Sequence, residues 1–204
     1  HINLSRKAAT EGMVLLKNEE NILPLKKDAK IAVIGEMAHT PRYQGAGSSI
    51  VNAIKVDCAY DSIVEKGAKV TYAQGYSTAK KNKVSDEKFI SDAVEAAKGK
   101  DAVLLFIGLT EEFESEGFDR RHIGIPPLHT KLVDAVSAVN ENVVVVLAGG
   151  AVVEMPWADK VKGILNSILG GEATGSAAAD ILFGDVNPSG KLAETYPVAL
   201  SDTP

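Results

Sequence analysis

Apolar and polar residues alternate along this chain in blocks that predict alternating strands and helices. Short apolar runs rich in β-branched residues predict buried strands at 29–35, 68–73, 103–107, 142–147 and 161–168. The stretches between them predict helices at 3–18, 59–66, 85–97, 126–139 and 172–183, and a last short strand is expected at 192–196. Because strands and helices alternate, we expect right-handed crossovers and one mostly parallel sheet with helices on both faces.

Local signals predict where several of these elements begin and end. Gly67 and Gly184 are expected to end helices, because glycine readily adopts the left-handed conformation that follows a helix. Ser85 is expected to cap the helix that follows it, and the Pro126-Pro127 pair is expected to open another. The chain shows no internal repeat and no low-complexity linker, so we expect residues 1–204 to form one domain.

Composition excludes several classes of protein. With 22 basic and 27 acidic residues and no basic stripe, a nucleic-acid partner is not expected. No apolar run reaches the roughly 18 residues of a membrane span, so no membrane partner is expected either. The single cysteine, Cys58, excludes an intramolecular disulfide and a cysteine-rich metal site, and we expect it to be a small buried apolar residue.

Three familiar kinds of site are poorly supported. The loop at 36–49 contains Gly45-Ala46-Gly47-Ser48-Ser49, but these glycines lie ten residues beyond the end of the first predicted strand and no Gly-Lys-Ser/Thr follows. This loop is therefore interpreted as a surface loop or as one that lines a pocket shared with another domain. No histidine has metal-ligand spacing, so His39, His122 and His129 are expected to be surface or packing residues and no metal or other cofactor is expected. A serine hydrolase elbow, Gly-x-Ser-x-Gly, is also missing.

The best candidate for chemistry is the acidic loop, residues 111–120, which follows the strand predicted at 103–107. It places four glutamates within six positions, and ligands bind at the carboxyl ends of strands in open α/β sheets. Crowded carboxylates repel one another, which predicts a raised pKa for at least one and the capacity for general acid catalysis. Phe113 and Phe118 suggest that the loop packs against other residues, and the alternative is a solvated run of charges.

The order of several motifs resembles the second, C-terminal domain of glycoside hydrolase family 3 β-glucosidases. The central motif is Glu114-Ser115-Glu116-Gly117-Phe118-Asp119-Arg120 followed by Ile125-Pro126, which is similar to that family's Glu-Gly-Tyr-Asp-Arg…Leu-Pro segment. The others are residues 8–18 with 23–25, residues 44–49, 155–157, 170–175 and 184–192. Each motif alone is weak, but their order along nearly the whole chain is specific.

The resemblance implies an (α/β)6 sandwich, with three layers and a six-stranded sheet, that packs on a TIM-barrel domain. In this family the barrel carries the nucleophilic aspartate and the second domain supplies the acid/base glutamate of a retaining β-glycosidase. Motif alignment assigns that role to Glu116, with Glu114 and Glu112 as rivals. Asp119 and Arg120 are expected to hold the loop, since the two side chains can pair. The implied substrate is a β-glycoside or oligosaccharide with a terminal non-reducing β-D-glycosyl residue.

The chain departs from the family in having no Ser-Asp-Trp motif and no barrel. We therefore expect it to be one domain of a larger enzyme, inactive alone, with residues 1–28 forming a leading helix and linker from the barrel. Candidates for substrate contacts on the leaving-group side are Arg42, Tyr43 and Ser48. Two other functions stay open at this point: a non-catalytic carbohydrate-binding or scaffolding module of the same fold, and a flavodoxin-like nucleotide-binding domain.

Overall fold

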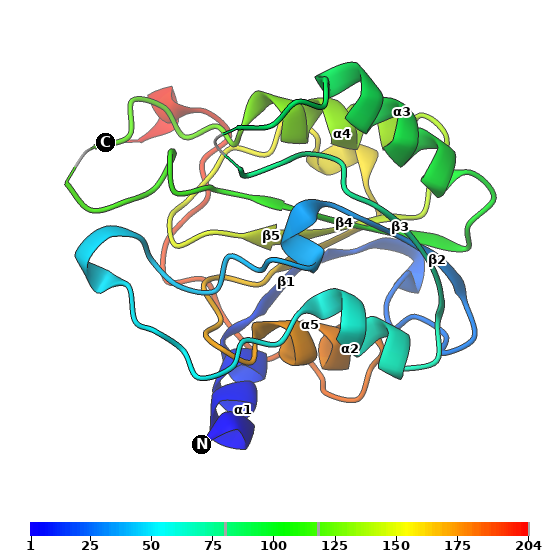
Figure 1. The fold of residues 1–204 in the computed structure, drawn as a ribbon, viewed down its shortest axis with the longest axis horizontal. Coiled ribbons are helices and arrows are strands. Elements are labelled where there is room, and N and C mark those ends of the chain that lie inside the picture. Colours follow the sequence, from blue (N-terminus) through cyan, green and yellow to red (C-terminus); the bar gives the residue numbers. More distant parts are fainter. Residues whose placement is uncertain (80, 118, 204) are drawn as a thin grey trace.

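A computed structural model describes residues 1–79, 81–117 and 119–203 (Figure 1). Its centre is a six-stranded sheet with the order β1-β6-β5-β4-β2-β3. Five strands are parallel, and β1 runs antiparallel to β6 at one edge. The strands are β1 (Val14–Asn18), β2 (Lys30–Ile34), β3 (Lys69–Ala73), β4 (Ala102–Gly108), β5 (Val143–Ala148) and β6 (Gly163–Asn166). The predicted mostly parallel six-stranded sheet is confirmed.

Helices cover both faces of this sheet. Figure 1 shows α3 and α4 on one side and α1, α2 and α5 on the other, which is the three-layer sandwich that the sequence predicts. The helices are α1 (Ile2–Gly12), α2 (Ala59–Glu65), α3 (Asp86–Ala97), α4 (Pro127–Ser137) and α5 (Thr174–Leu182). None of the helices in the described parts of the chain is both long and apolar enough to cross a membrane.

The central strands form the core because both of their faces are covered. Every residue of β4 and β5 is buried, which explains why these strands are continuous apolar runs rather than alternating ones. Four of the described glycines lie so close to a neighbouring backbone that an added Cβ atom would come within 2.5 Å of it: Gly35, Gly108, Gly175 and Gly190. At Gly35, for example, φ is +114° and a Cβ atom would lie 2.1 Å from the carbonyl oxygen of Phe106.

The predicted helix at 3–18 is wrong in its second half. The helix ends at Gly12, Met13 is extended, and residues 14–18 form β1, which pairs with β6. Apolar residues at 13–16 fit a helical period, but the free edge of β6 offers backbone hydrogen bonds that an isolated sequence window does not reveal. Residues 1–28 therefore include an edge strand of the sheet as well as a helix.

The predicted strand at 192–196 is also wrong, because this segment pairs with neither edge strand, β1 or β3. The segment instead runs along the surface without regular structure, and the Tyr196 hydroxyl accepts a hydrogen bond from the Asn166 amide at 2.9 Å. The strand predicted at 161–168 is shorter than expected, since Ile168 has a φ of +50° that is incompatible with a strand.

The local signals predicted at Gly67, Ser85, Pro126-Pro127 and Gly184 are confirmed, although α4 and α5 are shorter than the predicted 126–139 and 172–183. The Ser85 hydroxyl accepts a hydrogen bond from the backbone N–H of Lys88 at 3.3 Å, and Pro127 is the first residue of α4. Gly67 and Gly184 have φ values of +95° and +75°, which is the left-handed conformation expected after a helix. These local signals act within a few residues, so the sequence is sufficient to place them.

A cluster of charged side chains ties the three helices of one face together. The Asp180 carboxylate of α5 accepts hydrogen bonds from Arg6 Nε and Nη2 of α1, at 2.6 and 2.5 Å. It also accepts one from Lys66 Nζ, directly after α2, at 2.6 Å, and Lys66 donates to Asp185 at 2.5 Å. The Asp180 side chain is only 8% exposed, so its charge depends on these partners.

Candidate active site

Two loops meet at the carboxyl ends of β2 and β4, which are adjacent parallel strands. The chain leaves β2 through the 36–49 loop and leaves β4 through the acidic loop, residues 111–120. From β2 the chain continues outward to β3, whereas the strands that follow β4 extend to the other side, toward β5 and β6. This reversal of strand order is the position at which open α/β sheets bind ligands.

Glu116 lies at the exposed tip of the acidic loop and is held by Ser48 of the other loop. The Ser48 backbone N–H donates to Glu116 Oε2 at 2.9 Å, and the Ser48 hydroxyl donates a short hydrogen bond to the same oxygen. Among the described residues, the other oxygen, Oε1, has no hydrogen-bond donor. Gly47, with a φ of +80°, permits this approach, because a Cβ atom there would lie 3.1 Å from Cβ of Glu116. The carboxylate is therefore oriented on one side and open on the other.

Glu114 is held much more firmly and faces the protein. Its side chain is 18% exposed, and both of its oxygens lie 3.0 Å from the backbone N–H of Gly150, which follows β5. One of these oxygens also lies 3.7 Å from Arg42 Nη2. These contacts make Glu114 an anchor between the acidic loop and the end of β5. The sequence gives no sign of this contact except for the Gly149-Gly150 pair that ends the strand.

The remaining glutamates of the loop are exposed. Glu111 forms an ion pair with Arg42 Nη1 at 3.7 Å, and Glu112 makes no hydrogen bond or ion pair with the described residues. The sequence predicted a crowded and mutually repelling group. In the structure the carboxylates have separate partners, Ser48 for Glu116 and Gly150 for Glu114, and Arg42 offsets part of their charge.

The three predicted substrate contacts differ in their surroundings. The Arg42 side chain is only 8% exposed, and its guanidinium donates to the carbonyl oxygen of Glu114 at 3.0 Å, so it braces the acidic loop from within. The Tyr43 hydroxyl accepts a hydrogen bond from Gln44 at 2.8 Å. Ser48 is exposed and contacts Glu116. Of the three, Ser48 is the best placed to contact a molecule bound at Glu116.

The far end of the acidic loop is held by Arg120 rather than by a pair between Asp119 and Arg120. Arg120 Nη1 donates to the carbonyl oxygen of Val152 at 2.8 Å and Nη2 to that of Gly124 at 3.5 Å. Burial lowers the pKa of the Arg120 guanidinium, and the charge of Glu114 opposes this shift. Asp119 is exposed, and no ion pair between the two is present in the described part of the chain.

Aromatic packing fixes the near end of the loop. Phe113 packs against the core and makes an edge contact with the His122 ring, with 5.8 Å between ring centroids. The prediction that the loop packs against the protein is thus confirmed for Phe113, whereas Phe118 lies outside the described residues. The acidic loop has a packed base and an exposed tip that carries Glu116.

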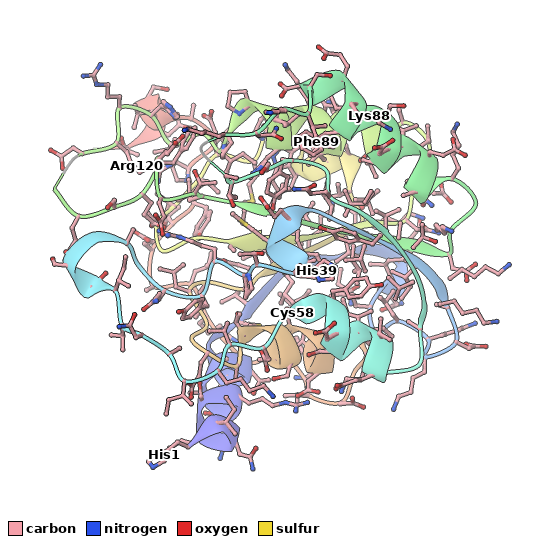
Figure 2. All side chains as sticks on the ribbon, viewed as in Figure 1. His1, His39, Cys58, Lys88, Phe89 and Arg120 are labelled. Carbon is pink, nitrogen blue, oxygen red and sulfur yellow. The ribbon has the colours of Figure 1, made fainter. Side chains whose placement is uncertain are left out.

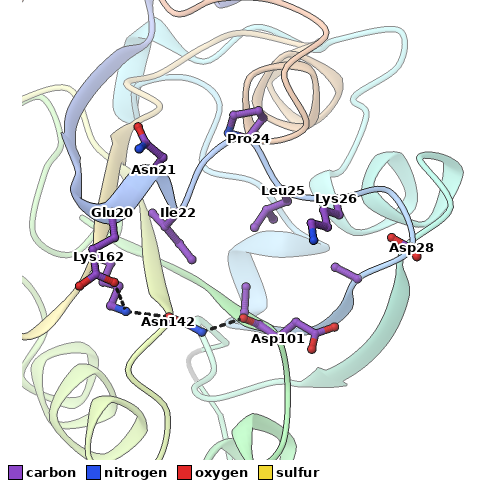
Figure 3. Close-up of a pocket in the computed structure, with 12 residues that line it drawn as sticks. Glu20, Asn21, Ile22, Pro24, Leu25, Lys26, Asp28, Asp101, Asn142 and Lys162 are labelled. Carbon is purple, nitrogen blue, oxygen red and sulfur yellow. Dashed lines mark hydrogen bonds and ion pairs between the residues drawn. The ribbon is translucent and has the colours of Figure 1, made fainter.

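Hollows lie at both edges of the sheet. A cavity of about 540 Å³ at the carboxyl edge is lined by both loops, including Arg42, Glu111 and Glu112. A second, of about 510 Å³, lies at the opposite edge, where Asp101 and Asn142 directly precede strands (Figure 3). There Lys162 donates to Glu20 at 2.6 Å and to Asn142 at 3.0 Å, so its charge is already matched. We therefore place the candidate site at the carboxyl edge.

Two other residues singled out from the sequence have clear positions. His129 is buried in α4 as a packing residue, as predicted, with Nδ1 3.1 Å from the carbonyl oxygen of Gly108. Burial lowers the pKa of His129 to about 3, while the contact with Gly108 opposes this shift. Cys58 is partly exposed, so the prediction of a buried cysteine is wrong. It directly precedes α2, at the end of an irregular segment that covers it only in part.

The comparisons with known proteins agree with one another. A family profile described as "Glycosyl hydrolase family 3 C-terminal domain" matches residues 13–204. The chain is 51% identical to thermostable beta-glucosidase B of Acetivibrio thermocellus and 45% identical to an exo-alpha-(1->6)-L-arabinopyranosidase of Bifidobacterium longum. Both matches cover 100% of this chain. The crystal structure of a Bifidobacterium adolescentis GH3 beta-glucosidase superposes on 99% of the chain, with a TM-score of 0.93 and 48% identity.

The chain spans only part of each of these relatives: 27% of the A. thermocellus protein, 28% of the B. longum protein and 30% of the B. adolescentis chain. The match nevertheless extends over nearly all of its residues, and the six-stranded sandwich is shared with the solved structure. The chain therefore belongs to the C-terminal domain family of glycoside hydrolase family 3.

Proposed function

We propose that this chain is the acid/base-bearing domain of a retaining, β-glucosidase-like glycosidase, which removes terminal non-reducing β-D-glycosyl residues. The observation that carries the proposal is the position of Glu116. Its carboxylate lies beyond the carboxyl edge of the sheet, with one oxygen held by Ser48 and the other open to a bound molecule. Such a group is oriented but accessible, as a residue that exchanges protons with a substrate must be.

In the proposed reaction Glu116 works with a nucleophilic aspartate supplied by a TIM-barrel domain of the same enzyme. A retaining mechanism needs the two carboxyl groups about 5 Å apart. Glu116 donates its proton to the glycosidic oxygen while the aspartate attacks the anomeric carbon, so the leaving group departs as an alcohol and a glycosyl-enzyme ester forms. Glu116, now ionised, then takes a proton from water as the water oxygen attacks the anomeric carbon and releases the aspartate.

The surroundings of the rival glutamates favour Glu116. Glu114 is occupied by the Gly150 N–H and braced by Arg42, so moving it toward a substrate would break the anchor of the loop. Glu112 is exposed and lines the cavity at the carboxyl edge, but no described residue orients its carboxylate. Glu112 therefore remains the stronger of the two rivals, because nothing prevents its movement.

Neither alternative function is favoured by a contact in the structure. A nucleotide phosphate in the glycine-containing loop would need the backbone N–H of Ser48, which is donated to Glu116 instead. A non-catalytic sugar-binding module would not require an oriented carboxylate at the tip of the loop. Because similar domains belong to relatives named for a β-glucoside and for an α-L-arabinopyranoside, we place the choice of sugar in the barrel domain.

The test uses the enzyme in which this chain is joined to its barrel domain. Glu116→Ala is expected to lower kcat by about 10²–10⁴-fold on a substrate whose leaving group needs an acid. Added azide should restore turnover of an activated aryl glycoside and yield the glycosyl azide, because azide attacks the glycosyl-enzyme without needing a base. The matched variants are Glu112→Ala, expected to retain activity, and Glu114→Ala, expected to lose stability without azide rescue.

Two outcomes would overturn the proposal. Rescue by azide in Glu112→Ala, and not in Glu116→Ala, would show that Glu112 is the acid/base and that the assignment to Glu116 is wrong. Robust hydrolysis of aryl β-glucosides by the purified 204-residue chain alone, lost in Glu116→Ala, would show that the complete site lies within this chain and that no barrel is needed.

A further inference from the structure

Three side chains able to bind a metal converge at the base of the 36–49 loop. His39 follows the short helix after β2, Cys58 directly precedes α2, and Asp61 lies in the first turn of α2. One donor atom from each lies within 4.8 Å of the others. Figure 2 shows His39 and Cys58 on neighbouring segments, although residues 40–57 separate them in sequence. Spacing along the chain does not reveal this group, because only the fold brings its members together.

The three donors are a nitrogen, a sulfur and an oxygen, which is a set that suits zinc. Zn²⁺ is bound by imidazole, thiolate and carboxylate at about 2.0–2.3 Å, most often with tetrahedral geometry. Ligand atoms of such a tetrahedron lie roughly 3.3–3.6 Å apart. Because the present separations do not exceed 4.8 Å, none needs to close by more than roughly 1.5 Å. Asp61 is exposed and Cys58 is partly exposed, so rotation of these two side chains toward His39 can achieve this.

The backbone and rings around the group are already held in place. The His39 ring stacks on Tyr60, with 4.1 Å between centroids, and makes an edge contact with Tyr72 at 4.5 Å. Asp57 accepts hydrogen bonds from the first turn of α5, and Gly175 of that helix lies directly against the backbone of Cys58. Packing alone explains the position of the His39 ring. The donor atoms of Cys58 and Asp61 lie within 4.8 Å of a nitrogen of that ring.

We propose that His39, Cys58 and Asp61 bind one Zn²⁺ ion, with water as the fourth ligand. The ion would join the two ends of the segment formed by residues 40–57, in the way that a metal clip closes a loop. This segment contains Ser48, which holds Glu116, so the ion would limit the motion of the loop without touching the reacting atoms. The site itself does not depend on the proposed glycosidase function.

The first measurement is a titration of the purified 204-residue chain with Co²⁺, followed by displacement with Zn²⁺ and by calorimetry. A bound thiolate gives a charge-transfer band in the near ultraviolet, which histidine and carboxylate ligands alone do not produce. The parent and all variants carry His1→Ala, because an amino-terminal histidine can bind zinc by itself; His1 directly precedes α1 (Figure 2). Zinc at a hundredfold excess over its Kd should raise Tm by about 5–10 °C.

Variants at the three positions decide the assignment. Cys58→Ser is expected to abolish the charge-transfer band, and His39→Gln and Asp61→Asn are expected to weaken zinc binding at least tenfold. The control is His122→Gln, an exposed histidine outside the group, which should bind zinc like the parent. If Cys58→Ser fails to fold by circular dichroism, the two exposed variants still decide.

The proposal is overturned if the parent chain shows no charge-transfer band with Co²⁺. It is also overturned if His39→Gln and Asp61→Asn bind zinc as tightly as the parent, because the ion would then lie elsewhere on the surface.

Discussion

Removal of the Asp180 carboxylate should destabilise the domain far more than removal of a surface carboxylate. Asp180 accepts three hydrogen bonds from cationic side chains and is 8% exposed, whereas Lys66 is 16% and Arg6 42% exposed. In Asp180→Ala, Lys66 keeps Asp185 as a partner and Arg6 can be hydrated, but the buried side of the cluster loses its negative charge. The loss in the free energy of unfolding arises because Arg6 and Lys66 both lose the carboxylate that they share.

Breaking a buried ion pair by removing one partner costs about 3–5 kcal/mol. Because Arg6 is partly exposed and Lys66 keeps Asp185, we expect the lower end, a loss of about 3 kcal/mol in the free energy of unfolding. The control is Asp92→Ala, which removes an exposed carboxylate paired with Lys88 within α3 at 2.6 Å. That change should cost no more than about 0.5 kcal/mol.

The assay is urea unfolding of the 204-residue chain, followed by circular dichroism and tryptophan fluorescence, with the slope m checked for each variant. A double-mutant cycle between Asp180→Ala and Lys66→Ala should show a positive coupling larger than that with Arg6→Ala, because Lys66 is the more buried partner. A cost within about 1 kcal/mol of the Asp92→Ala control, or no coupling to Lys66, would refute the argument.

The pH dependence provides an independent check. Burial raises the pKa of Asp180, but hydrogen bonds and charge from Arg6 and Lys66 outweigh it, so the pKa lies below its ordinary value. The stability that ionised Asp180 contributes is fully present above the ordinary carboxyl pKa of about 3.9. It is lost as the pH falls through the lowered native value. The difference in stability between the parent and Asp180→Asn should therefore shrink as the pH falls below about 4.

Two further predictions concern single positions in the core. Gly35→Ala should lower the free energy of unfolding by at least about 3 kcal/mol or prevent folding, since its Cβ would lie 2.1 Å from a backbone oxygen. The control is Gly99→Ala, where nothing lies within 4 Å of the added Cβ. It should lower the free energy of unfolding by only about 1–2 kcal/mol, because of its positive φ. Urea unfolding measures both, and similar costs would contradict the steric argument. Because His129 has a pKa of about 3 in the folded state and about 6.5 when unfolded, its contribution to stability should be present above about pH 6.5 and decline as the pH falls toward 3. His129→Gln should flatten the pH dependence of the urea midpoint between pH 6.5 and 4, and His122→Gln is the control; an unchanged slope in His129→Gln would contradict the assignment.

The sequence by itself was sufficient for every feature that depends on neighbours along the chain. The continuous apolar runs of β4 and β5, the Ser85 cap, the proline that opens α4 and the glycines that end helices all reflect local preferences. The order of the family motifs also pointed to the family and, through it, to the fold, both of which the comparisons confirm.

Contacts between distant segments were decided by the tertiary structure alone. Residues 14–18 form a strand because they make backbone hydrogen bonds with the otherwise free edge of β6. The spacing of apolar residues within the segment does not reveal these bonds. The different surroundings of the glutamates in the acidic loop arise in the same way. Gly150 binds Glu114, Ser48 binds Glu116, and Arg42 of the 36–49 loop donates to the backbone of the acidic loop. His39, Cys58 and Asp61 meet only because the fold brings the segment after β2 beside the start of α2. Composition and spacing determine which residues are present, whereas the partners that orient each side chain follow from packing across the sheet.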